Sequence, residues 1–184
     1  MTSLQDHHQL NHERFKKHLS DSTPDVFRIG HFIHRKGLPI YIPGYKVANN
    51  LQEIDNNQDE GDLTFFCDGK KYITEVKATN TSDFTDTVKH KFSTFFVCAK
   101  HSFERYKKEK PSYYFILNAS RTYTAIIDVQ KTFDKWQVIE TSDRRYVNYS
   151  QERYACPIDV VKIEKLDWVY DTWKSSKITC CANQ

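Results

Sequence analysis

Apolar and polar positions follow two different periods along the first 130 residues. Residues 25–37 repeat apolar positions at helical spacing, with a capping Ser22 and a first-turn Pro24 before them and Gly37 after them, which predicts a first helix. Shorter runs rich in β-branched and aromatic residues predict strands. Three of these strand candidates follow the helix directly, at 38–43, 62–66 and 71–77.

The next segment returns to a helical period. Apolar residues spaced by three or four positions over 83–108 predict one long amphipathic helix, and Pro111 lies just beyond its end. Two further strand candidates, 113–117 and 123–129, are separated by the polar turn 118–121. The expected order is therefore helix, three strands, helix and two strands, which is a mixed α/β arrangement.

The second and third strand candidates are joined by Asp68-Gly69, a strong two-residue hairpin signal. If this dipeptide forms the turn, facing residues have numbers that sum to 137. Asp62 then faces Glu75 on one side of the sheet, and Lys77 shares that side because side chains alternate along a strand.

Two facing carboxylates need an explanation, because like charges placed opposite each other destabilise a sheet. Their Cβ atoms would lie about 4.5–5.5 Å apart, close enough to share one Mg²⁺ through oxygens at about 2.1 Å. The alternative is a solvated strand face with ordinary surface charges. The flanking positions favour a covered hairpin, since most of them are apolar on both sides: Leu63, Phe65, Phe66, Tyr72, Ile73 and Val76.

Asp62 followed by Glu75-Val76-Lys77, on strands in this order, resembles the signature of the PD-(D/E)xK nuclease superfamily. The resemblance covers residues 22–129 and implies a restriction-endonuclease-like αβββαβ core with a mixed central sheet flanked by helices. It implies that Asp62, Glu75 and the Val76 carbonyl hold Mg²⁺ or Mn²⁺, and that Lys77 assists the hydrolysis of phosphodiester bonds, more often in DNA than in RNA.

The chain departs from the superfamily pattern in two places. Gly61 stands where the name of the motif has proline, and the acid near the start of the first helix is Asp25, shorter than the usual glutamate. Asp25 is a possible accessory residue of the site, with helix capping as the alternative.

Two other functions remain open. A metal-dependent RNA endonuclease is one, because some superfamily members place a metal-binding histidine on the helix before the acidic motif, and His31 and His34 lie on the predicted helix here. Imidazole would favour Mn²⁺, whereas packing or surface exposure is the alternative role. The other is a non-catalytic nucleic-acid-binding module on the same scaffold.

Composition is consistent with a single domain over residues 1–184: an N-terminal helical arm (1–21), a catalytic core (22–129) and a β-rich C-terminal elaboration (130–184). Strand candidates at 136–140, 146–149 and 157–163 are expected to add to the core sheet. A net charge of +3 gives modest support for a nucleic-acid partner. Lys89 and Lys91, on the polar side of the expected long helix, are candidate phosphate contacts, with a solvated helix face as the alternative. A homodimer is possible by analogy with nucleases that cut both strands.

The chain contains no apolar run long enough to span a membrane, and its first residues lack the pattern of a signal peptide. We therefore expect an intracellular protein that is neither secreted nor membrane-bound. Five cysteines without a CxxC pair argue against a disulfide framework and against a structural zinc site.

Overall fold

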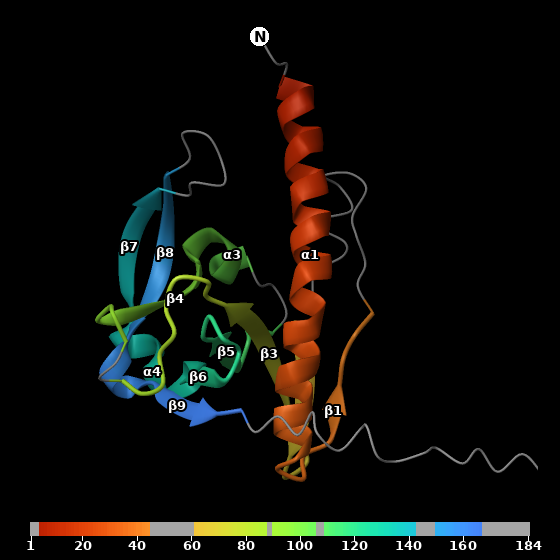
Figure 1. The fold of residues 1–184 in the computed structure, drawn as a ribbon, viewed down its shortest axis with the longest axis vertical. Helices are drawn as coiled ribbons and strands as arrows, with labels where there is room; N and C mark the ends of the chain where they lie inside the picture. The colour runs from red at the N-terminus through yellow and green to blue at the C-terminus, as the bar shows by residue number, and fades with distance from the viewer. Residues whose placement is uncertain (1–3, 45–60, 88–89, 106–108, 143–149, 167–184) are drawn as a thin grey trace, which may run out of the picture.

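The computed structural model describes residues 4–44, 61–87, 90–105, 109–142 and 150–166 (Figure 1). Its elements are α1 (Leu4–His34), β1 (Ile40–Tyr41), β2 (Leu63–Cys67), β3 (Lys70–Ala78), β4 (Thr94–Ala99), α3 (Lys100–Arg105), β5 (Tyr113–Leu117), β6 (Tyr123–Asp128), α4 (Val129–Thr132), β7 (Gln137–Ser142), β8 (Ser150–Pro157) and β9 (Lys162–Lys165), with 3₁₀ turns at Phe133–Lys135 and Ile158–Val160. None of the described helices is long and apolar enough to cross a membrane.

The larger sheet has six strands in the order β1-β2-β3-β5-β6-β9. β3 and β5 run parallel, and every other neighbouring pair is antiparallel. The sheet is therefore mixed, as predicted, and the protein is an α/β protein with few helices. The predicted strands at 38–43, 113–117 and 123–129 correspond to β1, β5 and β6, and the short β1 lies at a sheet edge.

The β2–β3 hairpin has the predicted turn and register. Asp68 and Gly69 both adopt positive φ, 50° and 73°, the backbone conformation that a tight Asp-Gly turn requires. The ladder runs from Cys67↔Lys70 to Leu63↔Thr74, and each pair sums to 137. The sum rule therefore holds for all five pairs of the ladder.

The start of the first helix was predicted wrongly. α1 begins at Leu4 and continues through Pro24, so neither Ser22 nor Asp25 caps it. Pro24 favours a helix start in the sequence, because proline in a helix interior removes one backbone hydrogen bond. Apolar residues that follow it, among them Val26 and Ile29, are buried against the sheet. The N-terminal end of α1 extends beyond both sheets (Figure 1).

The predicted long helix over 83–108 does not form. Residues 94–99 are β4, and α3 is only six residues long. Phe95 and Val97 are buried while Phe96 between them is exposed, which is the alternation of a strand. Aromatic and β-branched residues favour strands, and their spacing happened to match a helical period as well.

The C-terminal part was expected to extend the core sheet, and this is wrong for most of it. β7 and β8 pair with β4 in a separate three-stranded sheet, in the order β4-β8-β7. Only β9 joins the larger sheet, beside β6. The strand predicted at 157–163 is replaced by a 3₁₀ turn and β9, while the strand predicted at 146–149 lies outside the described residues.

Two hydrophobic clusters divide the molecule into three layers. One packs α1 against a face of the larger sheet, through residues such as Ile29, Val76 and Phe115. The other packs the opposite face against the smaller sheet, through residues such as Tyr114 and Val97. α1, the larger sheet and the smaller sheet follow one another across Figure 1.

Candidate functional site

Glu75 and Lys77 lie on the face of β3 that is turned away from α1. Val76 between them belongs to the cluster beneath α1, and side chains alternate along a strand. Glu75 pairs with Tyr114 of β5, and Lys77 pairs with Ile116. Both β5 residues belong to the cluster beneath the smaller sheet. The candidate acid and lysine are thus half-buried at the layer between the two sheets.

Asp62 does not extend the β2–β3 ladder, which ends at Leu63↔Thr74. Its backbone N–H donates to the Thr74 carbonyl at 3.0 Å. Its carboxylate Oδ2 accepts a hydrogen bond from the backbone N–H of Val76 at 2.8 Å. The predicted cross-strand pair of Asp62 and Glu75 is therefore not part of the ladder, and the Asp62 carboxylate instead bonds the amide that joins Glu75 to Val76.

Gly61 allows this approach. Its φ is +81°, a conformation that proline cannot adopt, and a Cβ at this position would lie 2.5 Å from Ile73 Cγ2. Gly61, in the left-handed conformation, therefore places Asp62 directly beside β3. This is a physical reason for glycine where the motif is named for proline.

The Val76 carbonyl points to the same edge of β3 as the Val76 N–H, because both groups of a strand residue face the same neighbour. That N–H is bonded to Asp62, so the carbonyl also points toward the Asp62 side, beyond the last pair of the β2 ladder. The backbone thus directs two of the three predicted metal ligands, the Asp62 carboxylate and the Val76 carbonyl, to one strand edge.

Lys77 lies over an aromatic ring. Its Nζ is 5.4 Å from the ring centroid of the buried Tyr114, within the range of a cation–π contact. Cys98 of β4 is close enough to respond to both predicted site charges. Burial raises the pKa of its thiol, while Lys77 and a hydrogen bond with Tyr114 oppose the rise and Glu75 adds to it.

Sequence reasoning missed Cys98 and Tyr114 as neighbours of the site. Residues 94–99 were expected to be helical, which gave no reason to place Cys98 against β3. Tyr114 was expected only as part of a strand. The run of β-branched and aromatic residues at 94–97 was the available sequence signal for a strand.

Asp25 is engaged in a structural ion-pair network. It is buried, its Oδ1 is 2.7 Å from Arg28 Nη1, and its Oδ2 is 3.2 Å from Arg121 Nε. Arg121 also donates to the carbonyl of Thr79 and to Oδ1 of Asn80, just after β3. Asp25 therefore holds α1 to the end of β3 and to the β5–β6 turn, and both its oxygens face cations.

The remaining predicted contacts are dispersed. His31 and His34 are exposed in the last turn of α1. Lys91 is exposed ahead of β4, with its Nζ 5.8 Å from the Phe92 ring centroid, and Lys89 lies outside the described residues. The lysine-lined helix face does not form, because the expected helix is absent.

The available donors suit a hard cation. Asp62, Glu75 and the Val76 carbonyl offer only oxygen, the donor type that Mg²⁺ takes in proteins. Within the described ranges, no three or more His, Cys, Asp or Glu side chains gather in a way that could hold a metal. A cation here would depend on two carboxylates, one carbonyl and groups of the substrate or water.

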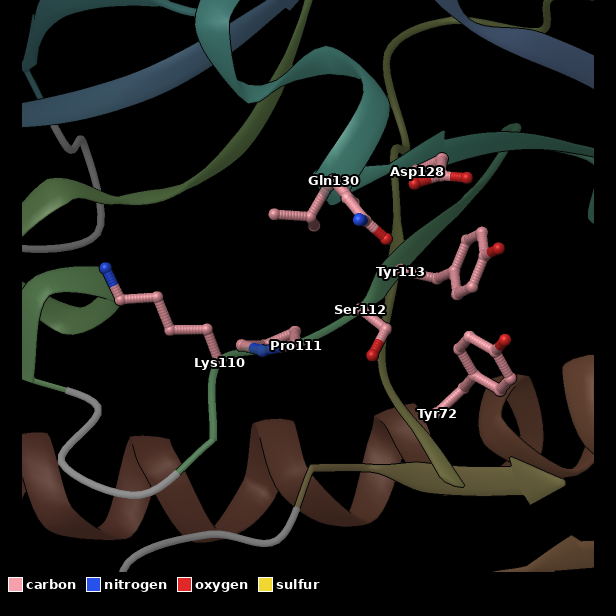
Figure 2. A pocket seen from close by; sticks show the side chains of 8 residues that line it. Tyr72, Lys110, Pro111, Ser112, Tyr113, Asp128 and Gln130 are labelled. Atoms are coloured by element: carbon pink, nitrogen blue, oxygen red, sulfur yellow. The ribbon is translucent and has the colours of Figure 1, made fainter. Parts of the chain in front are cut away.

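A separate pocket lies where β5 begins and β6 ends, with a volume of about 240 Å³. Figure 2 shows Tyr72, Tyr113 and Asp128 along one side of it, with Lys110 at the other end. Burial and the hydrogen-bonded Asp128 carboxylate raise the pKa of Tyr113 to about 12. Asp62, Glu75 and Lys77 are not among the residues that line this pocket.

We compared the chain with protein-family models, with curated proteins and with solved structures, and none of these comparisons gave a match.

Proposed function

We propose that the protein is a metal-dependent nuclease that hydrolyses phosphodiester bonds, with DNA as its substrate. The observation that carries this proposal is the hydrogen bond from the Val76 amide to the Asp62 carboxylate. This bond holds the Asp62 carboxylate against the backbone of Glu75-Val76-Lys77, although the β2–β3 ladder ends at Leu63, one residue after Asp62. The sequence resemblance to PD-(D/E)xK nucleases involves the same residues.

Asp62, Glu75 and the Val76 carbonyl are the groups that would hold Mg²⁺ or Mn²⁺. When bound, such an ion stabilises negative charge on a phosphate and lowers the pKa of a coordinated water. The hydrogen bond from Val76 restricts the orientation of the Asp62 carboxylate before any ligand arrives, and a restricted ligand needs less reorganisation during binding.

Lys77 would act on the phosphate or on the attacking water. Its ammonium is held above the Tyr114 ring on the same face of β3 as Glu75. A half-buried ammonium stabilises a developing negative charge more strongly than an exposed one, because less solvent screens it. Its charge also offsets that of Glu75 while no cation is bound.

The test compares the wild type with Glu75→Gln, and with Glu152→Gln as a matched control at an exposed glutamate of β8. Single-stranded DNA, double-stranded DNA and RNA are each incubated with Mg²⁺, Mn²⁺ or EDTA. We expect metal-dependent DNA cleavage that Glu75→Gln lowers more than about a hundredfold and that Glu152→Gln leaves intact.

Circular dichroism and thermal unfolding would establish that both variants are folded. Equal cleavage by Glu75→Gln and the wild type would refute the assigned site. Cleavage of RNA alone would refute the assigned substrate, and failure of the folded wild type to cleave any substrate would refute the proposed activity.

A further inference from the structure

Two exposed aromatic residues share the sheet face of Glu75 and Lys77. Phe66 is directly opposite Lys71, and Tyr41 of β1 is opposite Thr64, which is in turn opposite Ile73. Facing residues of antiparallel strands point to the same side, and Lys71, Ile73, Glu75 and Lys77 alternate along β3. All of these side chains therefore lie on the face turned away from α1.

On this face of β1, β2 and β3, Tyr41 and Phe66 are exposed although their neighbours Thr64 and Ile73 are buried. Tyr41 is 53% exposed and Phe66 is 41% exposed, whereas Phe65, the neighbour of Phe66 on the α1 side, is buried and stacked on Tyr72. Thr64 is on the same face as Tyr41 and Phe66, and it is 2% exposed. Tyr41 and Phe66 are diagonal cross-strand neighbours, with Cα atoms about 7–8 Å apart. Together they form a small aromatic platform.

Positive charge accompanies the platform. Lys71 is exposed directly opposite Phe66 on the same face. Lys71 Nζ is 3.5 Å from a carboxylate oxygen of Glu109, but both side chains are largely exposed, so this ion pair is weak and easily exchanged for another anion. Lysine beside exposed rings is the combination that binds a nucleic-acid backbone and its bases together.

The platform is also aligned with the candidate site. Lys71 and Glu75 are four positions apart along β3, a distance of about 13 Å at the rise of a strand. Lys71 and the candidate site therefore lie on one face of the hairpin, with the buried Ile73 between Lys71 and Glu75.

We propose that the substrate reaches this site as a single strand, with its bases stacked on Tyr41 and Phe66 and its phosphates beside Lys71. Base faces are available for stacking on side chains only where they are not stacked on one another, as in single strands. The inference rests on the proposed nuclease function for what happens at Glu75, but binding at the platform can be measured without cleavage.

The experiment measures fluorescence anisotropy of a labelled oligothymidylate of about 15 nucleotides in EDTA, where no cleavage takes place. We expect Tyr41→Ala and Phe66→Ala each to weaken binding about fivefold to a hundredfold, the range found for loss of one stacked ring. Phe66→Tyr, which keeps the ring, should bind like the wild type. Phe96→Ala is the matched control, because Phe96 is 50% exposed on the smaller sheet.

Lys71→Gln provides an independent readout. It should weaken binding and reduce the slope of log affinity against log salt by about 0.7, the value for one phosphate contact with a single strand. Unchanged binding by both alanine variants, equal loss with Phe96→Ala, or tighter binding to duplex of the same length would overturn the inference. These results do not depend on cleavage, so they are distinct from a failure of Glu75→Gln to abolish activity.

Discussion

The hydrogen bond between Asp62 and Val76 makes a quantitative prediction, because two substitutions affect it differently. Asp62→Ala removes the acceptor and leaves the partly buried Val76 N–H without it. Such a loss costs about 1–3 kcal/mol of the free energy of unfolding. Asp62→Asn keeps an oxygen acceptor but loses the charge, which lowers the strength of the bond by about 1 kcal/mol.

For a chain of 184 residues, each 1 kcal/mol corresponds to about 2–4 °C in the melting temperature. We therefore expect Asp62→Ala to melt about 2–12 °C below the wild type and Asp62→Asn about 2–4 °C below it, with Asp62→Ala the less stable of the two, both measured in EDTA. Removing the negative charge near Glu75 offsets part of the loss in both variants equally, so the order of the two is the robust quantity.

Both variants should lose cleavage, since neither retains the carboxylate. Differential scanning calorimetry gives the stability order, and a nuclease assay gives the activity. If Asp62→Ala were as stable as the wild type, the Val76 hydrogen bond would not anchor Asp62, and the reasoning that brings this acid to the site would fail. Full activity in Asp62→Asn would refute the site itself.

Three further predictions concern the surroundings of the site. Lys77→Ala should lower turnover far more than oligonucleotide affinity in EDTA, whereas Lys91→Ala should lower affinity alone and flatten its salt dependence. Asn118→Ala should cost about 2–4 kcal/mol in urea unfolding, because the buried Asn118 Oδ1 accepts the backbone N–H groups of residues 122 and 123. Burial lowers the pKa of His90 from 6.5, so the native state binds fewer protons than the unfolded state below that value. The free energy of unfolding that neutral His90 contributes should be complete above pH 6.5 and should decline as the pH falls below 6.5. In urea unfolding at several pH values, His90→Phe should lose less stability over this range than the wild type.

The parts of the fold that the sequence predicted correctly depend on local signals. The hairpin follows from a dipeptide that tolerates two positive φ angles, and its register follows from the turn. β5 and β6 follow from aromatic and β-branched runs on either side of a polar turn. The grouping of Glu75 and Lys77 on one face follows from strand alternation alone.

The failed predictions all involve choices that neighbouring residues leave open. Pro24 can begin a helix or interrupt one, and the continuous α1 follows it with a buried apolar face. Residues 94–99 fit a helical period by their spacing and a strand by their residue types, and pairing with β8, more than 50 residues later, selects the strand. Asp25 could cap a helix locally, but its partner Arg121 is distant in sequence.

The sequence by itself therefore determined the β2–β3 hairpin, its register and the residues that share each of its faces, because these depend on turn conformation and on a period of two residues. Only the tertiary structure decided that Asp62 leaves the ladder to bond Val76, that Cys98 lies close enough for the charges of Lys77 and Glu75 to act on its pKa, and that Tyr41 and Phe66 stay exposed on the same sheet face. These contacts depend on which distant segments pack together, and that choice is made by burial of the whole chain rather than by local preference.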